Sequence, residues 1–276
     1  MHPSFISTLI SPHHGGALTL DVHQMDGENV LTGVLTDSAG VRYPIRDGIP
    51  CLLPSNLLDE QRSEMVARDA QVKDYDRMAI LHLFGKVEIP LTLRALKADK
   101  ADCLLEAGCG TGRMTRHMSR VCKTLVSIDF SFESLRVNRH KAARMGLKNV
   151  HFVQADLCNL PFPDDAFSSV VSCQVLEHVP NHHSRKAAVR ELARVSKTGS
   201  RLVLSAYQHS IFTKTFGQKQ GAHEGGIPYF RFSKSELRDL LSAGFAVDRI
   251  SGKLVYLHLA TCRNVVSGRA TAPSGS

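Results

Sequence analysis

From residue 101 onward, the sequence alternates short apolar runs with segments whose apolar residues recur at helical spacing. The segments predict helices that begin at Gly112 and cover residues 131–145, 182–197 and 233–243. The runs predict strands in DCLLEAG, TLVSID, VHFVQAD, FSSVVSCQ and RLVLSAY. Strands that alternate with helices form a parallel sheet covered on both faces, with ligands bound beyond the carboxyl ends of the strands. The sequence therefore predicts an α/β fold.

Two further strand-like runs, FAVDRISG and LVYLHLATC, follow the last of these helices. We expect a short turn at Ser251 and Gly252 to join them, so that they pair as an antiparallel hairpin in an otherwise parallel sheet. A dinucleotide-binding fold does not need such a hairpin. The pattern therefore favours a different class of cofactor.

The chain before residue 101 follows other patterns. Residues 1–55 carry apolar runs between Gly, Asn and Asp turn signals, which predict a small β-rich module. Residues 56–100 return to helical spacing and predict a helical connector or lid. We place the α/β domain at residues 101–262 and a flexible polar tail at residues 263–276.

The composition is that of an ordinary folded protein, with 43% hydrophobic and 22% charged residues in 276. No apolar run approaches the ~20 residues that cross a bilayer, and the N-terminus has no basic region before a long apolar one. We therefore expect a cytoplasmic protein that does not enter the membrane. The seven cysteines are scattered without a Cys-x-x-Cys pair, which predicts reduced thiols and no structural zinc.

The net charge of +8 lies mainly after the first module, because residues 1–55 carry two basic and five acidic side chains. Basic residues recur on predicted helices, for example at Lys186, Arg190 and Arg194. Such a surface could attract RNA or an anionic small molecule, or it could simply be the solvated outer face of the helices.

The stretch LLEAGCGTGRMT places three glycines directly after an apolar strand, at Gly108, Gly110 and Gly112. Glycines there let a backbone come close to a ligand. Arg113 stands where the dehydrogenase fingerprint would have its third glycine, and the chain has no phosphate-binding G-x-x-x-x-G-K motif. The loop therefore predicts a ligand other than these two.

Two acidic residues end the following predicted strands. Asp129 ends the second strand, where a carboxylate can bind both hydroxyls of a ribose, and Asp156 ends the third, next to the backbone N–H of Leu157, where it can read the amino edge of an adenine. Either aspartate alone could be a helix cap or a turn former. Together with the glycine loop, they predict an adenosine-containing ligand.

The segment from about Cys103 to Ser205 resembles the class I S-adenosylmethionine-dependent methyltransferases of the type 11 group. The matching parts are LLEAGCGTGR, SIDFS, QADLCNLPFPDDAFSSVVSCQVLEHV and ELARVSKTGSRLVLS. The resemblance implies a Rossmann-like sheet of seven strands with a final antiparallel pair. It implies S-adenosylmethionine as the cofactor and S-adenosylhomocysteine as its product.

The resemblance also implies a role for each matching residue. Glu106 and the three glycines would hold the methionine part of the cofactor, with Arg113 beside them. Asp129 would bind the ribose, Phe130 would flank the adenine, and Asp156 and Leu157 would bind its edge. Cys173 and Gln174 would form the floor beneath the sulfonium, and Tyr75 would close over the cofactor or else be an ordinary core or surface tyrosine.

Methyl transfer from a sulfonium makes modest demands on a protein. A helix N-terminus after the glycines would offer N–H groups to the cofactor's carboxylate. The methyl group already sits on an activated leaving group, so the protein mainly holds the acceptor in line, an effect of ~7–11 kcal/mol. A general base is needed only for an acceptor that is protonated at working pH.

The acceptor side offers weaker signals. His178, in VLEHVPN, is the candidate catalytic base, or else it packs at the start of the next helix. Residues 207–232 are long for a connecting loop and predict a lid or substrate wall. The candidates for contacting an acceptor in this loop are His209, His223, Tyr229 and Arg231.

The stretch GVLTDSAGVRYPIRDGIPCLLP resembles the zinc-ribbon modules found beside some methyltransferases. Where a ribbon would place paired cysteines, this sequence has SPHH at residues 11–14 and TDSAG at residues 36–40. A tetrahedral zinc site needs four nitrogen or sulfur ligands, and His13, His14 and Asp37 make a poor set. We expect a metal-free module that serves as a lid or an interaction surface.

The acceptor class stays open at this stage. The chain lacks the N/D-P-P-Y/F motif for planar amino groups and a Pro-Cys nucleophile for carbon-5 of cytosine. We expect methylation of an O, N or C atom of a small molecule such as a secondary metabolite. The alternatives are methylation of tRNA or rRNA, favoured by the basic helices, and a cofactor-binding interaction protein without enzymatic activity.

Overall fold

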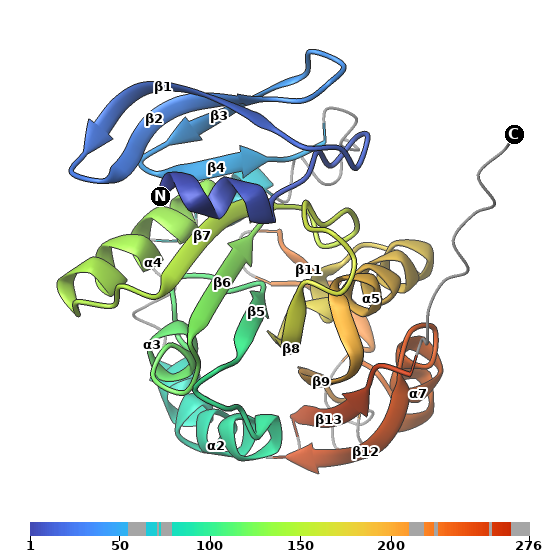
Figure 1. Cartoon of the computed structure of the whole chain (residues 1–276). Coiled ribbons are helices and arrows are strands. Elements are labelled where there is room, and N and C mark those ends of the chain that lie inside the picture. Colours follow the sequence, from blue (N-terminus) through green and yellow to red (C-terminus); the bar gives the residue numbers. More distant parts are fainter. Residues whose placement is uncertain are drawn as a thin grey trace, which may run out of the picture.

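The computed structural model describes residues 1–54, 65–70, 72, 79–209, 218–223, 226–253 and 256–265. Its central feature is a sheet in the order β1-β2-β3-β4-β7-β6-β5-β8-β9-β13-β12 (Figure 1). Helices α2 (Ala79–Leu96), α3 (Thr115–Met118) and α4 (Phe132–Arg144) lie on one side of the sheet, and α5 (His182–Val195) and α7 (Lys234–Leu241) lie on the other. The predicted α/β class, with helices on both faces, is confirmed.

Seven strands form the part of the sheet after residue 101. They are β5 (Cys103–Ala107), β6 (Thr124–Asp129), β7 (Val150–Ala155), β8 (Phe167–Cys173), β9 (Ser196–Tyr207), β12 (Ala246–Lys253) and β13 (Leu257–Arg263). Neighbouring strands from β7 to β9 pair in parallel, while β13 is antiparallel to both β9 and β12. The predicted mostly parallel sheet with a final antiparallel pair is thus confirmed.

The turn of the final hairpin does not lie where we predicted it. Ser251 and Gly252 belong to β12 and pair with Leu259 and His258 of β13. A side chain at position 252 would collide with Gln208, because a Cβ on Gly252 would lie 2.7 Å from Oε1 of Gln208. A glycine required by a close neighbour was mistaken for a turn glycine.

The helix after the glycine loop is later and shorter than predicted. Residues 111–114 form turns, and α3 covers only Thr115–Met118. Gly110 and Gly112 have φ of 50° and 96°, a left-handed conformation that a right-handed helix cannot contain. A helix of one turn adds little dipole, so the expected helix N-terminus does not form at the glycines.

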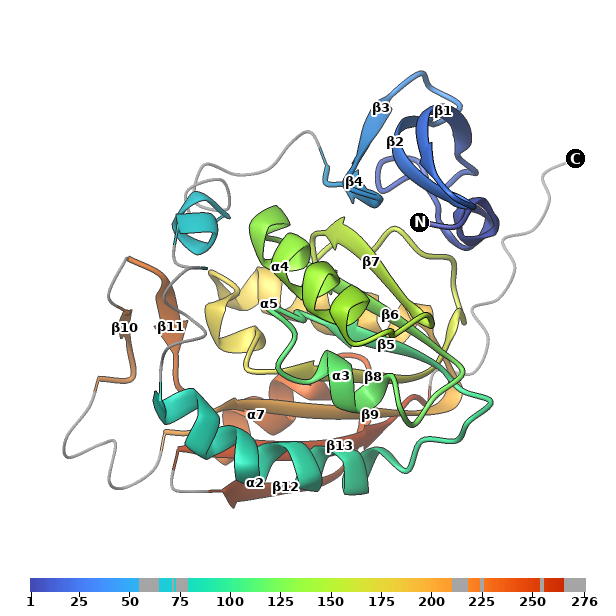
Figure 2. The same ribbon diagram turned by 90° about the vertical axis from the view of Figure 1, so that its left-hand side faces the viewer.

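Four strands precede the α/β part of the chain, after a short 3-10 helix η1 (Pro3–Thr8). They are β1 (Thr19–Asp26), β2 (Asn29–Thr36), β3 (Arg42–Arg46) and β4 (Ile49–Leu52). They pair antiparallel with one another, and β4 then pairs in parallel with β7 through Cys51–Gln154 and Leu52–Ala155. The first 52 residues therefore extend the central sheet at its β7 edge, beyond α4 (Figure 2).

A hydrogen bond joins the two loops of this module that would carry zinc ligands in a ribbon. The hydroxyl of Ser11 donates to Oδ2 of Asp37 at 2.7 Å, while Oδ1 of Asp37 accepts from the backbone N–H groups of Ala39 and Val41 at 3.0 and 2.9 Å. Asp37 is thus used as a turn former. Within the residues the structure describes, no group of three or more His, Cys, Asp or Glu side chains is placed to hold a metal ion.

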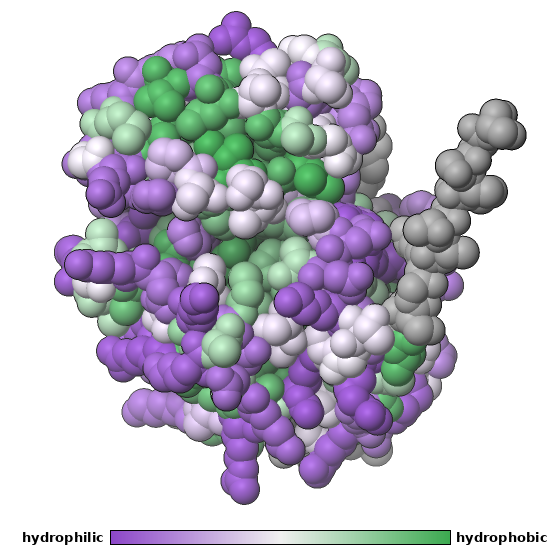
Figure 3. Space-filling model, in the orientation of Figure 1, coloured by the Kyte–Doolittle hydropathy of each residue, from purple (hydrophilic) through white to green (hydrophobic). Residues whose placement is uncertain are grey.

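The surface differs between the two ends of the sheet. In the view of Figure 3, apolar residues gather over the N-terminal strands, while hydrophilic residues dominate around α2 and α3. On β1, Val22 and Met25 are 41% and 44% exposed. No described helix is both long and apolar enough to cross a bilayer, and all seven cysteines are free thiols.

Candidate active site

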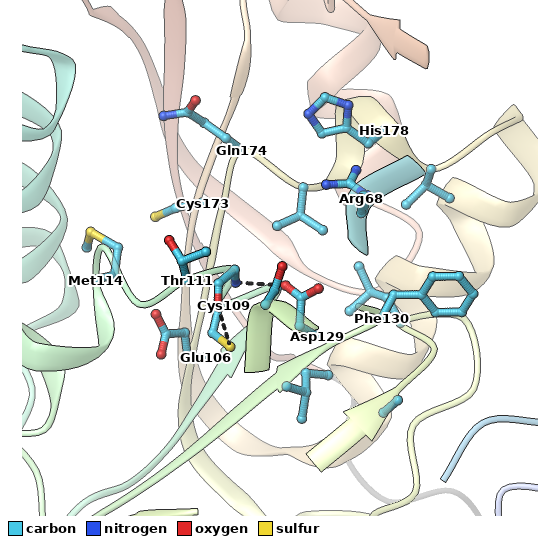
Figure 4. A pocket seen from close by; sticks show the side chains of 18 of the residues that line it. Arg68, Glu106, Cys109, Thr111, Met114, Asp129, Phe130, Cys173, Gln174 and His178 are labelled. Carbon is cyan, nitrogen blue, oxygen red and sulfur yellow. Dashed lines mark hydrogen bonds between the residues drawn. The ribbon is translucent and has the colours of Figure 1, made fainter. Parts of the chain in front are cut away.

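A pocket lies at the carboxyl ends of β5, β6, β7 and β8, the edge predicted from the strand and helix alternation. Ten of the predicted cofactor residues line it: Glu106, Gly108, Gly110, Arg113, Asp129, Phe130, Asp156, Leu157, Cys173 and Gln174. In Figure 4, Asp129 lies between Glu106 and Phe130, while Arg68 and His178 lie on the opposite side of the pocket. Tyr75, the remaining aromatic candidate, lies outside the described residues.

The three glycines of the loop differ in their surroundings. Gly108 has φ of 81°, and a Cβ there would lie 2.3 Å from Cγ2 of Val175. Gly110 has nothing within 4 Å of such a Cβ, so its position faces open space. Gly112 does not line the pocket, because a Cβ there would lie 2.2 Å from Oδ1 of Asn138 on α4. Gly112 thus packs the loop against the helix.

Asp129 braces the glycine loop from the end of β6. Its Oδ2 accepts from the backbone N–H of Gly110 at 2.7 Å, and its Oδ1 accepts from that of Ser131 at 2.9 Å (Figure 4). Burial raises the pKa of the Asp129 carboxyl, and the nearby charge of Arg68 opposes this shift. The carboxylate therefore already holds the loop in the position from which it would meet a ligand.

Glu106, at the end of β5, is 3% exposed. Both hydrogen bonds of its carboxylate go to one oxygen, Oε2, from the hydroxyls of Thr115 and Ser127, each at 2.7 Å. Burial raises its pKa to about 7, although these two hydroxyls lower it. A cationic ligand group at this end of the pocket would offset the burial cost of the charged form.

The far end of the pocket is formed by the loop after β7. Oδ1 of Asp156 accepts from the backbone N–H of Cys158 at 2.9 Å, which closes a turn around Leu157. Phe130, after β6, lines the same end. A carboxylate, an apolar side chain and an aromatic ring are thus brought together from two strand ends, as predicted.

Helix α2 fixes the floor of the pocket through a buried carboxylate that the sequence analysis missed. Oε2 of Glu88 accepts from Nε2 of Gln174 at 2.7 Å and from the Arg113 guanidinium at 2.5 Å, and its Oε1 accepts from the hydroxyl of Ser205. Glu88 is 5% exposed. Glu88 lies in the segment predicted as a helical connector, where the sequence pattern indicated a helix but no functional residue.

Cys173, beside Gln174 on this floor, is uncharged. Burial raises the pKa of its thiol to about 12. Its sulfur lies 4.0 Å from the hydroxyl of Thr92 on α2. A neutral, poorly nucleophilic thiol suits a wall residue and argues against a covalent role.

His178 lies on the acceptor side, in the 3-10 helix η2 (Leu176–His178), and is 8% exposed. Its Nδ1 lies 2.8 Å from the carbonyl oxygen of Pro228, so Nδ1 carries a proton and Nε2 is the acceptor nitrogen. Burial, followed by the charge of Arg68, lowers the pKa of His178 well below its ordinary value. The ring therefore lines the pocket as a neutral imidazole.

Strands β10 (Gln220–Ala222) and β11 (Pro228–Phe230) lie within the segment predicted as a substrate wall. The His223 ring lies 5.6 Å from that of His178 and 4.7 Å from that of Tyr229, and the Arg231 guanidinium lies 4.5 Å above the Tyr229 ring. These three candidates thus form one cluster behind His178. None of the four acceptor candidates lines the pocket, and the backbone N–H of His209 donates to the carbonyl of Phe232.

The fold and this pocket define an α/β protein with a nucleoside-sized site at its sheet edge. A family model described as a methyltransferase domain matches residues 105–204. Demethylmenaquinone methyltransferase of Thermobifida fusca is 33% identical over 118 residues, or 43% of this chain and 49% of that protein. Phosphatidylethanolamine N-methyltransferase of Cereibacter sphaeroides is 37% identical over 141 residues, or 49% of this chain and 67% of that protein.

A structural neighbour shows the same fold. The structure titled as a complex of DhpI with SAH superposes with a TM-score of 0.58 at 24% identity, covering 75% of this chain and 98% of that one. The chain belongs to the class I S-adenosylmethionine-dependent methyltransferases. The matched segment spans about half the length of the Thermobifida relative.

The residues of this pocket fit S-adenosylmethionine, the cofactor of the family. The carboxylate of Glu106 lies at one end, where the cofactor carries an ammonium group, and the carboxylate of Asp129 lies further along, beside the backbone N–H of Gly110. No side chain could be added at Gly108 without striking Val175. The order of these groups along the pocket matches the order of charges and hydroxyls along the cofactor.

Proposed function

We propose that this protein transfers a methyl group from S-adenosylmethionine to an O, N or C atom of a small-molecule acceptor by in-line displacement. The observation that supports this most directly is the single pocket that runs from Glu106 past Asp129 to Asp156 and also reaches His178. When bound, the cofactor supplies an electrophilic methyl group whose bond to sulfur breaks with its electron pair going to sulfur.

The chain's own residues bind and position the cofactor. Glu106 binds the amino group of the cofactor, Asp129 binds the ribose hydroxyls, and Asp156 with Leu157 and Phe130 holds the adenine. Gln174 and Cys173 form the floor, and Glu88 keeps Gln174 and Arg113 in place. Holding acceptor and donor in line then provides most of the rate enhancement.

A small organic acceptor fits the site better than RNA. The two relatives named above act, by their names, on a demethylmenaquinone and on phosphatidylethanolamine. The acceptor side of the pocket is lined by His178, Val179 and Pro180, and His178 is 8% exposed. Such a site suits a small molecule that can be shielded from water.

The test is methyl transfer from labelled S-adenosylmethionine to two separate pools, total RNA and a small-molecule extract of the producing cell. We expect label in the extract, and much less label with Asp129→Ala as the matched control. Label in RNA alone would replace the small-molecule proposal by the RNA alternative. Failure to bind the cofactor at all would overturn the proposed function.

A further inference from the structure

Arg68 is a pocket residue to which the proposed function gives no role. It lines the pocket from a stretch of chain that the sequence analysis predicted as a helical connector or lid. In Figure 4, its side chain lies beside that of His178, on the side of the pocket opposite Glu106. The amino-acid group of the cofactor lies at the Glu106 end in the proposed function. Arg68 therefore faces the space left for the acceptor.

A carboxylate contact anchors the segment that carries Arg68. Residues 65–70 are helical, and Asp69 lies at the start of α4. Its Oδ1 accepts from the hydroxyl of Ser131 and, at 3.3 Å, from the backbone N–H of Glu133. A negative charge at a helix N-terminus is stabilising. The chain next to Arg68 is thus fixed to the same part of the fold that forms the cofactor half of the pocket.

The acceptor side of the pocket carries positive charge. After burial, the charge of Arg68 is the largest influence that lowers the pKa of His178. Burial and the charges of Arg231 and Arg68 likewise lower the pKa of His223, behind His178. Glu177, the neighbour of His178, does not offset these charges at pH 7, because burial raises its pKa to about 8. A site surrounded in this way attracts an anion.

The bound cofactor adds a second positive charge, its sulfonium, to the pocket that contains Arg68. Arg113, another guanidinium in the lining, is already paired with Glu88. Arg68 acts on Asp129, but that carboxylate accepts from two backbone N–H groups and, in the proposed function, binds the ribose. Like charges repel strongly where water is excluded. An anionic group on the acceptor would relieve the repulsion between the sulfonium and Arg68.

We propose that the acceptor is an organic anion, and that Arg68 binds its carboxylate or phosphate group while a second atom of the acceptor receives the methyl group. This inference rests on the proposed function and names its acceptor class. A guanidinium donates two parallel N–H groups to either oxyanion, so Arg68 sets the orientation of the acceptor as well as its charge. The lone pair of the second atom forms the bond to the methyl carbon as the C–S electron pair leaves with sulfur, and any proton on that atom passes to water.

The first test is calorimetry on the protein loaded with S-adenosylhomocysteine. Benzoate and phenyl phosphate are the anionic probes, and uncharged benzamide is the matched control. We expect at least one anion to bind roughly tenfold more tightly than benzamide, because hydrogen bonds between charged groups are the stronger ones. The anion that binds more tightly identifies the oxyanion as carboxylate or phosphate. If neither anion binds more tightly than benzamide, the proposal is overturned.

The second test separates the small-molecule extract on an anion exchanger at pH 7 before the transfer of labelled methyl groups. We expect the label in the retained fraction. Arg68→Gln should raise the KM for that fraction roughly tenfold, and Arg68→Lys, which keeps the charge, should restore part of the loss. Arg116→Gln is the control, because it removes an exposed charge outside the pocket lining. All three variants should bind S-adenosylhomocysteine as the wild type does.

The outcomes distinguish this inference from the proposed function. Label in the unretained fraction alone would refute the anionic acceptor and leave the proposed function standing. A loss with Arg68→Gln that is matched by an equal loss of cofactor affinity would refute the role of Arg68 in acceptor binding. Failure of the wild type to bind S-adenosylmethionine would refute both.

Discussion

The two halves of the pocket are built differently. The cofactor half is made by the ends of neighbouring strands β5, β6 and β7, with Glu106 and Asp129 at the ends of β5 and β6 and Asp156 directly after β7. The acceptor half is lined by residues on and around η2, namely Gln174, Val175, His178, Val179 and Pro180. His178 is held there by a contact with the carbonyl of Pro228, which lies 50 residues further along the chain.

The backbone therefore determines the geometry of the cofactor half, whereas side-chain packing determines the geometry of the acceptor half. In the cofactor half, Asp129 holds the Gly110 backbone, and Gly108 leaves no space for a side chain. In the acceptor half, rings of His178, Tyr207 and His223 rest on one another at 5.6–5.8 Å. We therefore expect substitutions in the first half to damage cofactor binding and those in the second to change acceptor choice.

The largest effect should come from Gly108→Ala. Its φ of 81° and the 2.3 Å approach of Val175 make any side chain costly: ~1–3 kcal/mol for backbone strain and a further ~1–3 kcal/mol for overpacking. Denaturant unfolding and cofactor titration would measure both losses. Gly110→Ala is the control for the clash alone, since it shares the left-handed backbone (φ 50°) but has nothing within 4 Å of its added Cβ; equal loss of stability in both variants would contradict the role of Val175.

A pH effect of similar size should come from Glu106. Burial raises its pKa from 4.5 to about 7, so between these values the folded protein holds a proton that the unfolded chain has lost, and stability falls as pH rises. The shift corresponds to roughly 3 kcal/mol, at ~1.4 kcal/mol per pKa unit. In denaturant titrations, Glu106→Gln should gain about this much relative to wild type between pH 4.5 and 7, and a difference that does not change with pH would count against it.

Asp129→Ala should weaken cofactor binding by about 1–3 kcal/mol, because it leaves the Gly110 N–H and the ligand hydroxyls without their acceptor. Calorimetry with S-adenosylmethionine measures this directly. Acceptor affinity, measured at saturating cofactor, should stay unchanged. An unaltered cofactor affinity would show that the ribose does not bind at this residue.

The smallest effect should come from Gly252→Ala on the acceptor side. The added Cβ would meet the end of the Gln208 side chain at 2.7 Å, and a flexible amide can move aside at about 1 kcal/mol. We expect cofactor affinity to stay the same while the KM for the acceptor changes. A loss of cofactor affinity instead would show that the two halves are not independent.

The sequence predicted the parts of the molecule that depend on local patterns. Strand ends and the alternation of elements placed Glu106, Asp129 and Asp156 at one edge of the sheet, because parallel strands put their carboxyl ends together. Glycine roles were harder: Gly112 packs on Asn138 and Gly252 makes room for Gln208. Both glycines are required by close contacts with residues that are distant in sequence. Local sequence patterns do not reveal such contacts.

Contacts between distant segments account for the other differences. Glu88 was not recognised because its partners, Gln174 and Arg113, lie 86 and 25 residues away. The joining of the N-terminal strands to β7 was likewise invisible, since β4 has only four residues.

That joining has a consequence for how the chain folds. Strand β4 pairs with β7 through Cys51 and Gln154, which are 103 residues apart (154 − 51). At a synthesis rate of ~5–20 residues per second, β4 waits roughly 5–20 s for its partner. During that interval the edge of β4 is unpaired, and an unpaired edge is a template for association between chains. The strands made before β7 are therefore where we expect misassembly to begin when this protein is made quickly.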